Sequence, residues 1–71
     1  MGHRTAHLTT AAEAAADALA ALARRDGQPG TAEALRAGHT AVKAIDEALR
    51  ALHAARQALV SELVAEQSRL I

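Results

Sequence analysis

The chain has no cysteine, no Phe, Tyr or Trp, and a single proline among its 71 residues. The lack of cysteine excludes disulfides, thiolate chemistry and the usual structural zinc sites. The lack of aromatic side chains excludes the stacking platforms that bind single-stranded nucleic acid. No segment is rich in the β-branched and aromatic residues that favour strands. We therefore expect an all-α protein.

Neither sign of charge is in excess, because eight Lys and Arg residues balance eight Asp and Glu residues. Binding to nucleic acid requires a basic surface, so we expect no nucleic-acid partner. No run approaches the roughly eighteen apolar residues that cross a bilayer, and residues 1–10 contain no apolar signal segment. We therefore expect a cytoplasmic protein with no membrane partner.

Alanine supplies most of the apolar residues, which make up 51% of the chain. Alanine has the highest intrinsic helix propensity, so the composition favours helices. A chain this short buries only about 60% of its unfolded surface, so its core is thin. Association with another chain would therefore add stability.

The first helix is predicted over residues 9–26, after a flexible N-terminus of residues 1–8. Thr10 and Glu13 match the capping box, in which two side chains satisfy unpaired backbone donors at the start of a helix. A start near Thr9 or Thr10 follows, although one more turn back to Thr5 is compatible with the pattern. Glycine and proline in residues 26–30 predict the turn of an αα-hairpin.

The second helix is predicted over residues 31–69, with Thr31 as its N-cap. Gly38 either ends a short helix or lies inside one long helix. A glycine inside a helix costs only about 1 kcal/mol relative to alanine. Because the apolar spacing continues through Gly38, one long helix is the favoured interpretation. The region 9–71 then forms a single antiparallel hairpin of a short and a long helix.

Both helices carry apolar residues at alternating spacings of three and four, which predicts a coiled-coil-like seam. Folding about Gln28 is expected to pack the first row against the second. The first row is Leu8, Ala12, Ala15, Leu19 and Leu22, and the second is Leu35, Gly38, Val42, Ile45, Leu49 and Leu52.

The short helix cannot cover the whole of the long one, so an apolar stripe is expected to lack a partner beyond Leu52. A second copy would supply that partner in a dimeric four-helix bundle, and a groove on a different protein would be the other candidate. Arg56 interrupts the stripe; it either extends over apolar surface or pairs with Glu62 or Glu66 of another chain. The predicted interface residues are Leu52, Leu59, Val60, Leu63, Val64 and Leu70, with Ile71 beside them.

The four histidines are the residues with the most evident chemistry. His3 and His7 share the i,i+4 spacing of metal ligands, and an antiparallel hairpin brings them towards His53. Solvent-exposed histidines are the favoured interpretation, so no metal site or other cofactor is predicted. The chain has no nucleophile with an adjacent base and no Gly-rich phosphate loop, so we expect no enzyme.

The sequence thus predicts a small non-catalytic interaction module that self-associates by helix packing and acts as an adaptor or regulator. A first alternative is a subunit whose C-terminal helix docks on a different protein. In size the chain is similar to secreted helical hairpins of the WXG type, although its turn lacks their Trp-x-Gly signature. Its alanine- and arginine-rich composition is similar to that of docking segments of modular synthases. A second alternative is a helical bundle that binds a small ligand or a metal through histidine.

Overall fold

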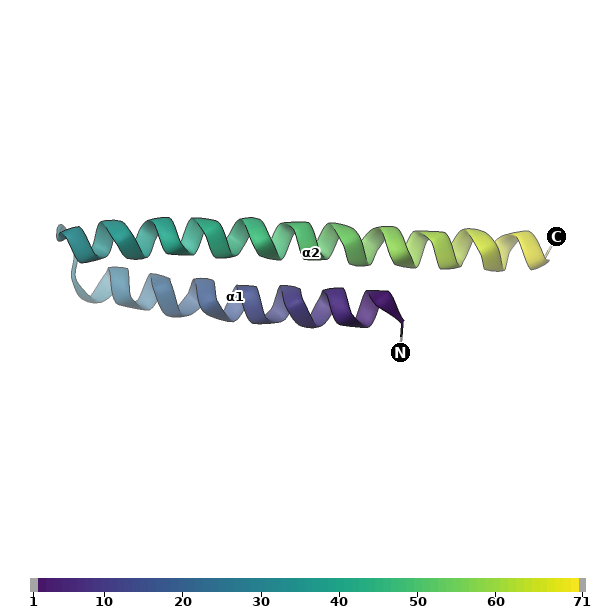
Figure 1. Ribbon diagram of the computed structural model, residues 1–71, viewed down its shortest axis with the longest axis horizontal. Helices are drawn as coiled ribbons and strands as arrows, with labels where there is room; N and C mark the ends of the chain where they lie inside the picture. Colours follow the sequence, from purple (N-terminus) through teal and green to yellow (C-terminus); the bar gives the residue numbers. More distant parts are fainter. Residues whose placement is uncertain (1, 71) are drawn as a thin grey trace.

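The structure is a computed structural model that describes residues 2–70, and this part of the chain contains two α-helices and no strand. Helix α1 spans His3–Gly27 and helix α2 spans Ala32–Leu70. The two helices lie side by side in opposite directions, and α2 continues beyond the N-terminus of α1 (Figure 1). The molecule is accordingly a thin rod with extents of 60 × 16 × 12 Å. The predicted all-α hairpin of a short and a long helix is therefore confirmed.

Helix α1 begins at His3 rather than near Thr9, so the predicted capping box is wrong. The hydroxyls of Thr9 and Thr10 donate to the carbonyl oxygens of Thr5 and Ala6, at 3.0 Å and 3.1 Å. A threonine hydroxyl can bond back to the preceding turn in this way, and the helix then continues through it. Residues 3–8, which we expected to lie outside the helix, are its first two turns and lie beside α2.

The turn connects the helices through Gln28–Thr31. Gly30 has a φ of 78°, in the left-handed region where a residue without a side chain is favoured. The Thr31 hydroxyl accepts a hydrogen bond from the Ala34 backbone N–H at 3.0 Å. This bond satisfies one of the unpaired donors at the start of α2, so Thr31 is the N-cap that the sequence predicts.

Helix α2 is continuous through Gly38, which lies where the side chain of Arg25 crosses from α1. A Cβ atom at Gly38 would lie 3.1 Å from the Arg25 guanidinium, closer than ordinary van der Waals contact. That guanidinium donates to the carbonyl oxygen of Ala34 at 3.1 Å. The glycine therefore provides room for an arginine that joins the end of α1 to the first turns of α2.

The buried residues between the two helices are all alanines. We call this row of residues the alanine seam. Alanine carries a single methyl group, so it permits helix axes to approach to the short end of the usual range of about 8–10 Å. The seam consists of Ala11, Ala14, Ala18 and Ala21 of α1 with Ala34, Ala37, Ala41, Ala44, Ala51 and Ala55 of α2, each no more than 9% exposed.

The seam predicted from the larger residues is therefore wrong by one position along each helix. Leu19 is 70% exposed and Leu35 is 60% exposed, whereas the preceding Ala18 and Ala34 are buried. The sequence contains two parallel rows with the same spacing of three and four, one of alanines and one of larger residues. The helices pack through the alanine row, and the larger residues lie beside the contact.

Candidate interaction surface

The large apolar side chains lie on one side of the hairpin, next to the alanine seam. Most of them follow a seam alanine by one position, as Leu19 follows Ala18 and Leu52 follows Ala51. One position turns a side chain by about 100° around a helix of 3.6 residues per turn. Because α1 and α2 face each other and run in opposite directions, this turn brings both rows to the same side. We define the apolar face as Leu8, Leu19, Leu22, Leu35, Val42, Ile45, Leu49, Leu52, Leu59, Leu63 and Leu70.

Every residue of the apolar face is exposed to solvent in the single chain. The exposed fraction ranges from 41% at Leu22 to 87% at Leu70. Single exposed leucines are common on protein surfaces, but a continuous apolar patch indicates a binding surface. The face extends along nearly all of α2, so it is long and narrow.

The apolar face is hollowed where the first turns of α1 meet α2. Leu8, Leu52, Ala55 and Leu59 line this hollow together with two arginines, Arg4 and Arg56. Arg4 is turned towards α2, because its Nε donates to a carboxylate oxygen of Glu62 at 2.9 Å. Arg56 makes no such ion pair within residues 2–70, so its charge in this hollow is not neutralised by another described side chain.

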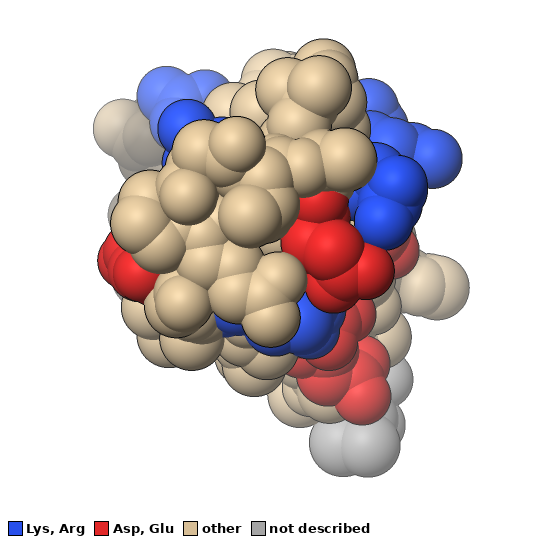
Figure 2. Space-filling view, turned by 90° about the vertical axis from the view of Figure 1, so that its left-hand side faces the viewer, with Lys and Arg blue, Asp and Glu red and all other residues tan. Residues whose placement is uncertain are grey.

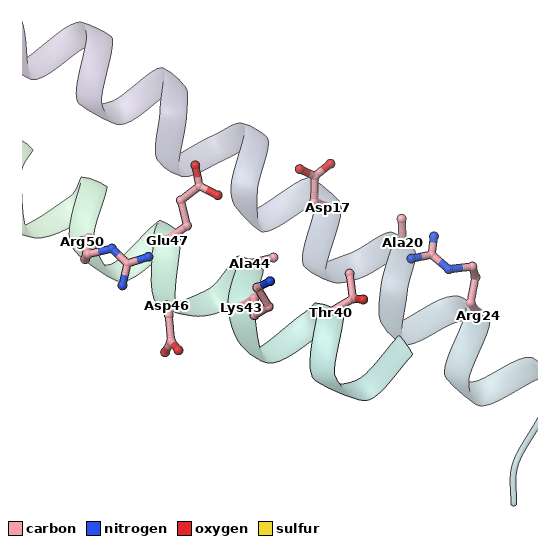
Figure 3. A pocket seen from close by; sticks show the side chains of 9 residues that line it. All are labelled: Asp17, Ala20, Arg24, Thr40, Lys43, Ala44, Asp46, Glu47 and Arg50. Carbon is pink, nitrogen blue, oxygen red and sulfur yellow. The ribbon is translucent and has the colours of Figure 1, made fainter. Parts of the chain in front are cut away.

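The opposite side of the hairpin is charged. Viewed from the turn, most of the visible acidic side chains lie on the right with basic ones beside them, whereas much of the left side is uncharged (Figure 2). The close-up shows Asp17 and Arg24 of α1 opposite Lys43, Glu47 and Arg50 of α2 around a shallow pocket (Figure 3). Cations and carboxylates alternate along it, so neither sign predominates to attract a charged ligand. We therefore interpret the pocket as part of the solvated surface and not as a binding site.

The six predicted interface residues fall into two rows. Leu52, Leu59, Leu63 and Leu70 belong to the apolar face, whereas Val60 and Val64 lie one position further around α2. Both valines are exposed, at 38% and 58%. The predicted second-row residue Ile71 lies outside the described residues.

The uncovered part of α2 is shorter than the sequence predicts, because α1 begins at His3. The ion pair between Arg4 and Glu62 shows how far along α2 the first turn of α1 extends. The stretch without an α1 neighbour therefore begins near Leu63 rather than at Leu52. Apart from Gly38, which is half-buried beside Arg25, the two rows predicted to form the contact between the helices belong instead to the exposed surface. The alanine repeat, with the same spacing as the larger residues, was the signal that could have revealed this.

The histidines do not form a metal site in the part of the chain that the structure describes. No three His, Asp or Glu side chains there lie close enough together to hold a metal ion. His53 lies 3.5 Å from the side-chain amide of Gln57. The structure therefore does not bring His3, His7 and His53 together.

Comparisons of this chain with protein-family models, with curated proteins and with solved structures find no match. Neither described helix has a segment that is long and apolar enough to span a membrane. The two faces of the hairpin are therefore the features that bear on function.

Proposed function

We propose that the protein is a non-catalytic association module that forms homodimers through its apolar face. The observation that supports this is the inverted distribution of its apolar residues: alanines are buried, and the large side chains are exposed. A fully buried leucine contributes about 1.5–3 kcal/mol, and the single chain forgoes part of this at every leucine, since each is at least 41% exposed. Contact with a second apolar surface would recover it.

A second copy of the chain is the partner that we favour. In a two-fold symmetric dimer the same patch serves both subunits, so one apolar face provides both halves of the interface. Two hairpins joined in this way form an assembly of four helices, as in the four-helix bundle that the sequence predicts. The module would act as an adaptor or regulator by holding two chains, and whatever binds them, at a set distance.

The alternative partner is a different protein that binds the C-terminal part of α2. Leu63, Val64 and Leu70 lie beyond the N-terminus of α1, and all three are more than half exposed. A single amphipathic helix that extends from a small domain is suited to a hydrophobic groove. This alternative predicts a chain that stays monomeric by itself.

Sedimentation equilibrium of the purified chain tests the proposal, with interference detection because the chain has no aromatic absorbance. We expect a dimer mass, and we expect Leu59→Asp and Leu63→Asp to be monomers because each places a charge in the interface. Ser61→Asp is the matched control, since Ser61 is exposed on another side of the same segment of α2. A monomeric wild-type chain at millimolar concentration, or dimers in both leucine variants, would contradict the proposal.

A further inference from the structure

The C-terminal part of α2 has a pattern that matches itself when it is reversed, and this pattern specifies how two copies meet. We propose that two chains join through residues 52–70 of their α2 helices, in antiparallel orientation, with Arg56 of each chain paired to Glu66 of the other. This inference rests on the proposed self-association. It adds an orientation and a register, and it confines the contact to the C-terminal part of the apolar face instead of the full length that a four-helix bundle would use.

The pattern follows the row that continues the apolar face along α2. From Leu52 the row has spacings of four, three, four, three and four, so it stays on one side of the helix. When a second α2 lies antiparallel on this side, centred between residues 59 and 63, each position of the row faces one position of its partner. Leu52 then faces Leu70, Leu59 faces Leu63, and Arg56 faces Glu66. Leucine meets leucine, and the two charges that interrupt the row meet each other.

The structure leaves this side of α2 open for a second helix. Arg56 and Glu66 are both exposed, and neither belongs to an ion pair within residues 2–70. Helix α1 covers the neighbouring side of α2. The ion pair of Arg4 with Glu62 lies near the N-terminal end of α1, where this cover stops. Since the row lies about a quarter turn from the alanine seam, a second α2 can pack on it without displacing α1.

Other arrangements of two hairpins set these charges against like charges or against leucine. In a parallel arrangement with the helices level, Arg56 faces Arg56 and Glu66 faces Glu66, which is repulsive. An antiparallel arrangement shifted by about seven residues, one heptad, keeps the spacing but sets Arg56 against Leu59 and Glu66 against Leu49. An unpaired charge in a helix interface is destabilising, so the charges select one register.

The selected register leaves part of each apolar face uncovered. Because the chains overlap only through the C-terminal part of α2, the two turns lie at opposite ends of the dimer. Leu19, Leu22, Leu35, Val42 and Ile45 lie outside the overlap. The adaptor role proposed above would then fall to these two surfaces, which the dimer holds far apart.

Charge exchange at the two positions tests the register. Arg56→Glu and Glu66→Arg each create two repulsive pairs per dimer, so we expect the dissociation constant to rise by about tenfold or more, equivalent to about 1.4 kcal/mol. The double variant restores both pairs in reversed order and leaves the net charge unchanged, so we expect it to dimerise within about threefold of wild type. The corresponding exchange of Glu47 and Arg50, on the charged side of α2, is the matched control, and we expect no change in any of its variants.

Cross-linking provides a second readout, because the chain has no cysteine of its own. We expect an oxidised mixture of Leu59→Cys and Leu63→Cys to give a disulfide-linked heterodimer. Leu59→Cys alone should cross-link poorly, since the two copies of residue 59 are offset by four residues, or about 6 Å along the helices. A mixture of Leu59→Cys with Leu35→Cys tests a full overlap of the two hairpins, and we expect no link.

The outcomes separate the two proposals. A wild-type monomer overturns both the register and the self-association. A wild-type dimer in which the double variant is as weak as the single variants, or in which residue 59 cross-links to residue 35, overturns the register and leaves self-association standing. If the double variant dimerises as tightly as wild type and residues 59 and 63 form a disulfide link, both the self-association and the register are supported. Circular dichroism of each variant verifies that the helices are intact.

Discussion

Enlarging one alanine of the seam should destabilise the hairpin more than any change of a leucine on its surface. Ala21 is 0% exposed and faces α2, so a leucine there has no space to enter. Extra carbons in a well-packed contact cost about 1–3 kcal/mol, and Ala21→Leu adds three of them, so we expect the upper end of this range, about 3 kcal/mol. For a domain of this size such a loss lowers the melting temperature by roughly 12–24 °C.

The matched control is Ala16→Leu, which makes the same change at an exposed position of the same helix. A surface substitution of this kind changes stability by less than about 0.5 kcal/mol. The inverse substitution, Leu22→Ala, is equally informative. A buried leucine would cost about 2–5 kcal/mol on truncation, but Leu22 is 41% exposed. We expect a loss below about 1 kcal/mol in the monomer.

The assay is thermal and urea unfolding followed by far-ultraviolet circular dichroism. The protein concentration is kept below the dissociation constant of any dimer, because association would add its own stability. Packing through alanine is contradicted if Ala21→Leu is as stable as Ala16→Leu while Leu22→Ala loses more than about 2 kcal/mol. That result would place the larger residues, and not the alanines, between the helices.

Two further predictions concern the N-terminal part of α2. Thr31→Ala removes the hydroxyl that caps α2 and should cost about 1 kcal/mol in urea unfolding, whereas Thr10→Ala, at a hydroxyl inside α1, should be neutral or slightly stabilising. Gly38→Ala gains about 1 kcal/mol of helix propensity but crowds the guanidinium that donates to Ala34, so we expect a net gain of less than half of that. In an Arg25→Ala background the full gain should appear; an equal gain in both backgrounds would show that the crowding is absent.

The surface leucines would be difficult to assign from the sequence, because two readings of one pattern compete. Leu19, Leu35 and Val42 have the spacing of a helix interface, and so do the alanines that precede them. Hydrophobicity alone favours the larger residues as the core. The geometry of the contact favours alanine, because one methyl group on each side permits close approach of the helices. Only packing of the two helices against each other separates these readings.

The start of α1 also depends on the packing of the helices as well as on the local sequence. The capping box at Thr10 is a valid local signal, but the residues before it also form helix, with Arg4 bound to Glu62 on the other helix. A local motif reports what a few neighbouring residues favour, and it contains nothing about a contact between residues 58 positions apart. The start of α1 is therefore the helix end that the local sequence predicts least well.

Local features of the sequence are sufficient to predict the all-α hairpin. The features that predict it are local, because each depends on residues that are close together in the sequence. They are the alanine-rich composition, the turn that contains Gly and Pro, the Thr31 cap and the apolar spacing that continues through Gly38. Which face lies inside depends instead on how the two helices pack. Because the helices pack through alanine, the larger apolar residues of both helices are brought to one exposed side. The stripe beyond Leu52 is evident in one segment of the sequence, but the part of the surface that both helices share exists only when they are paired.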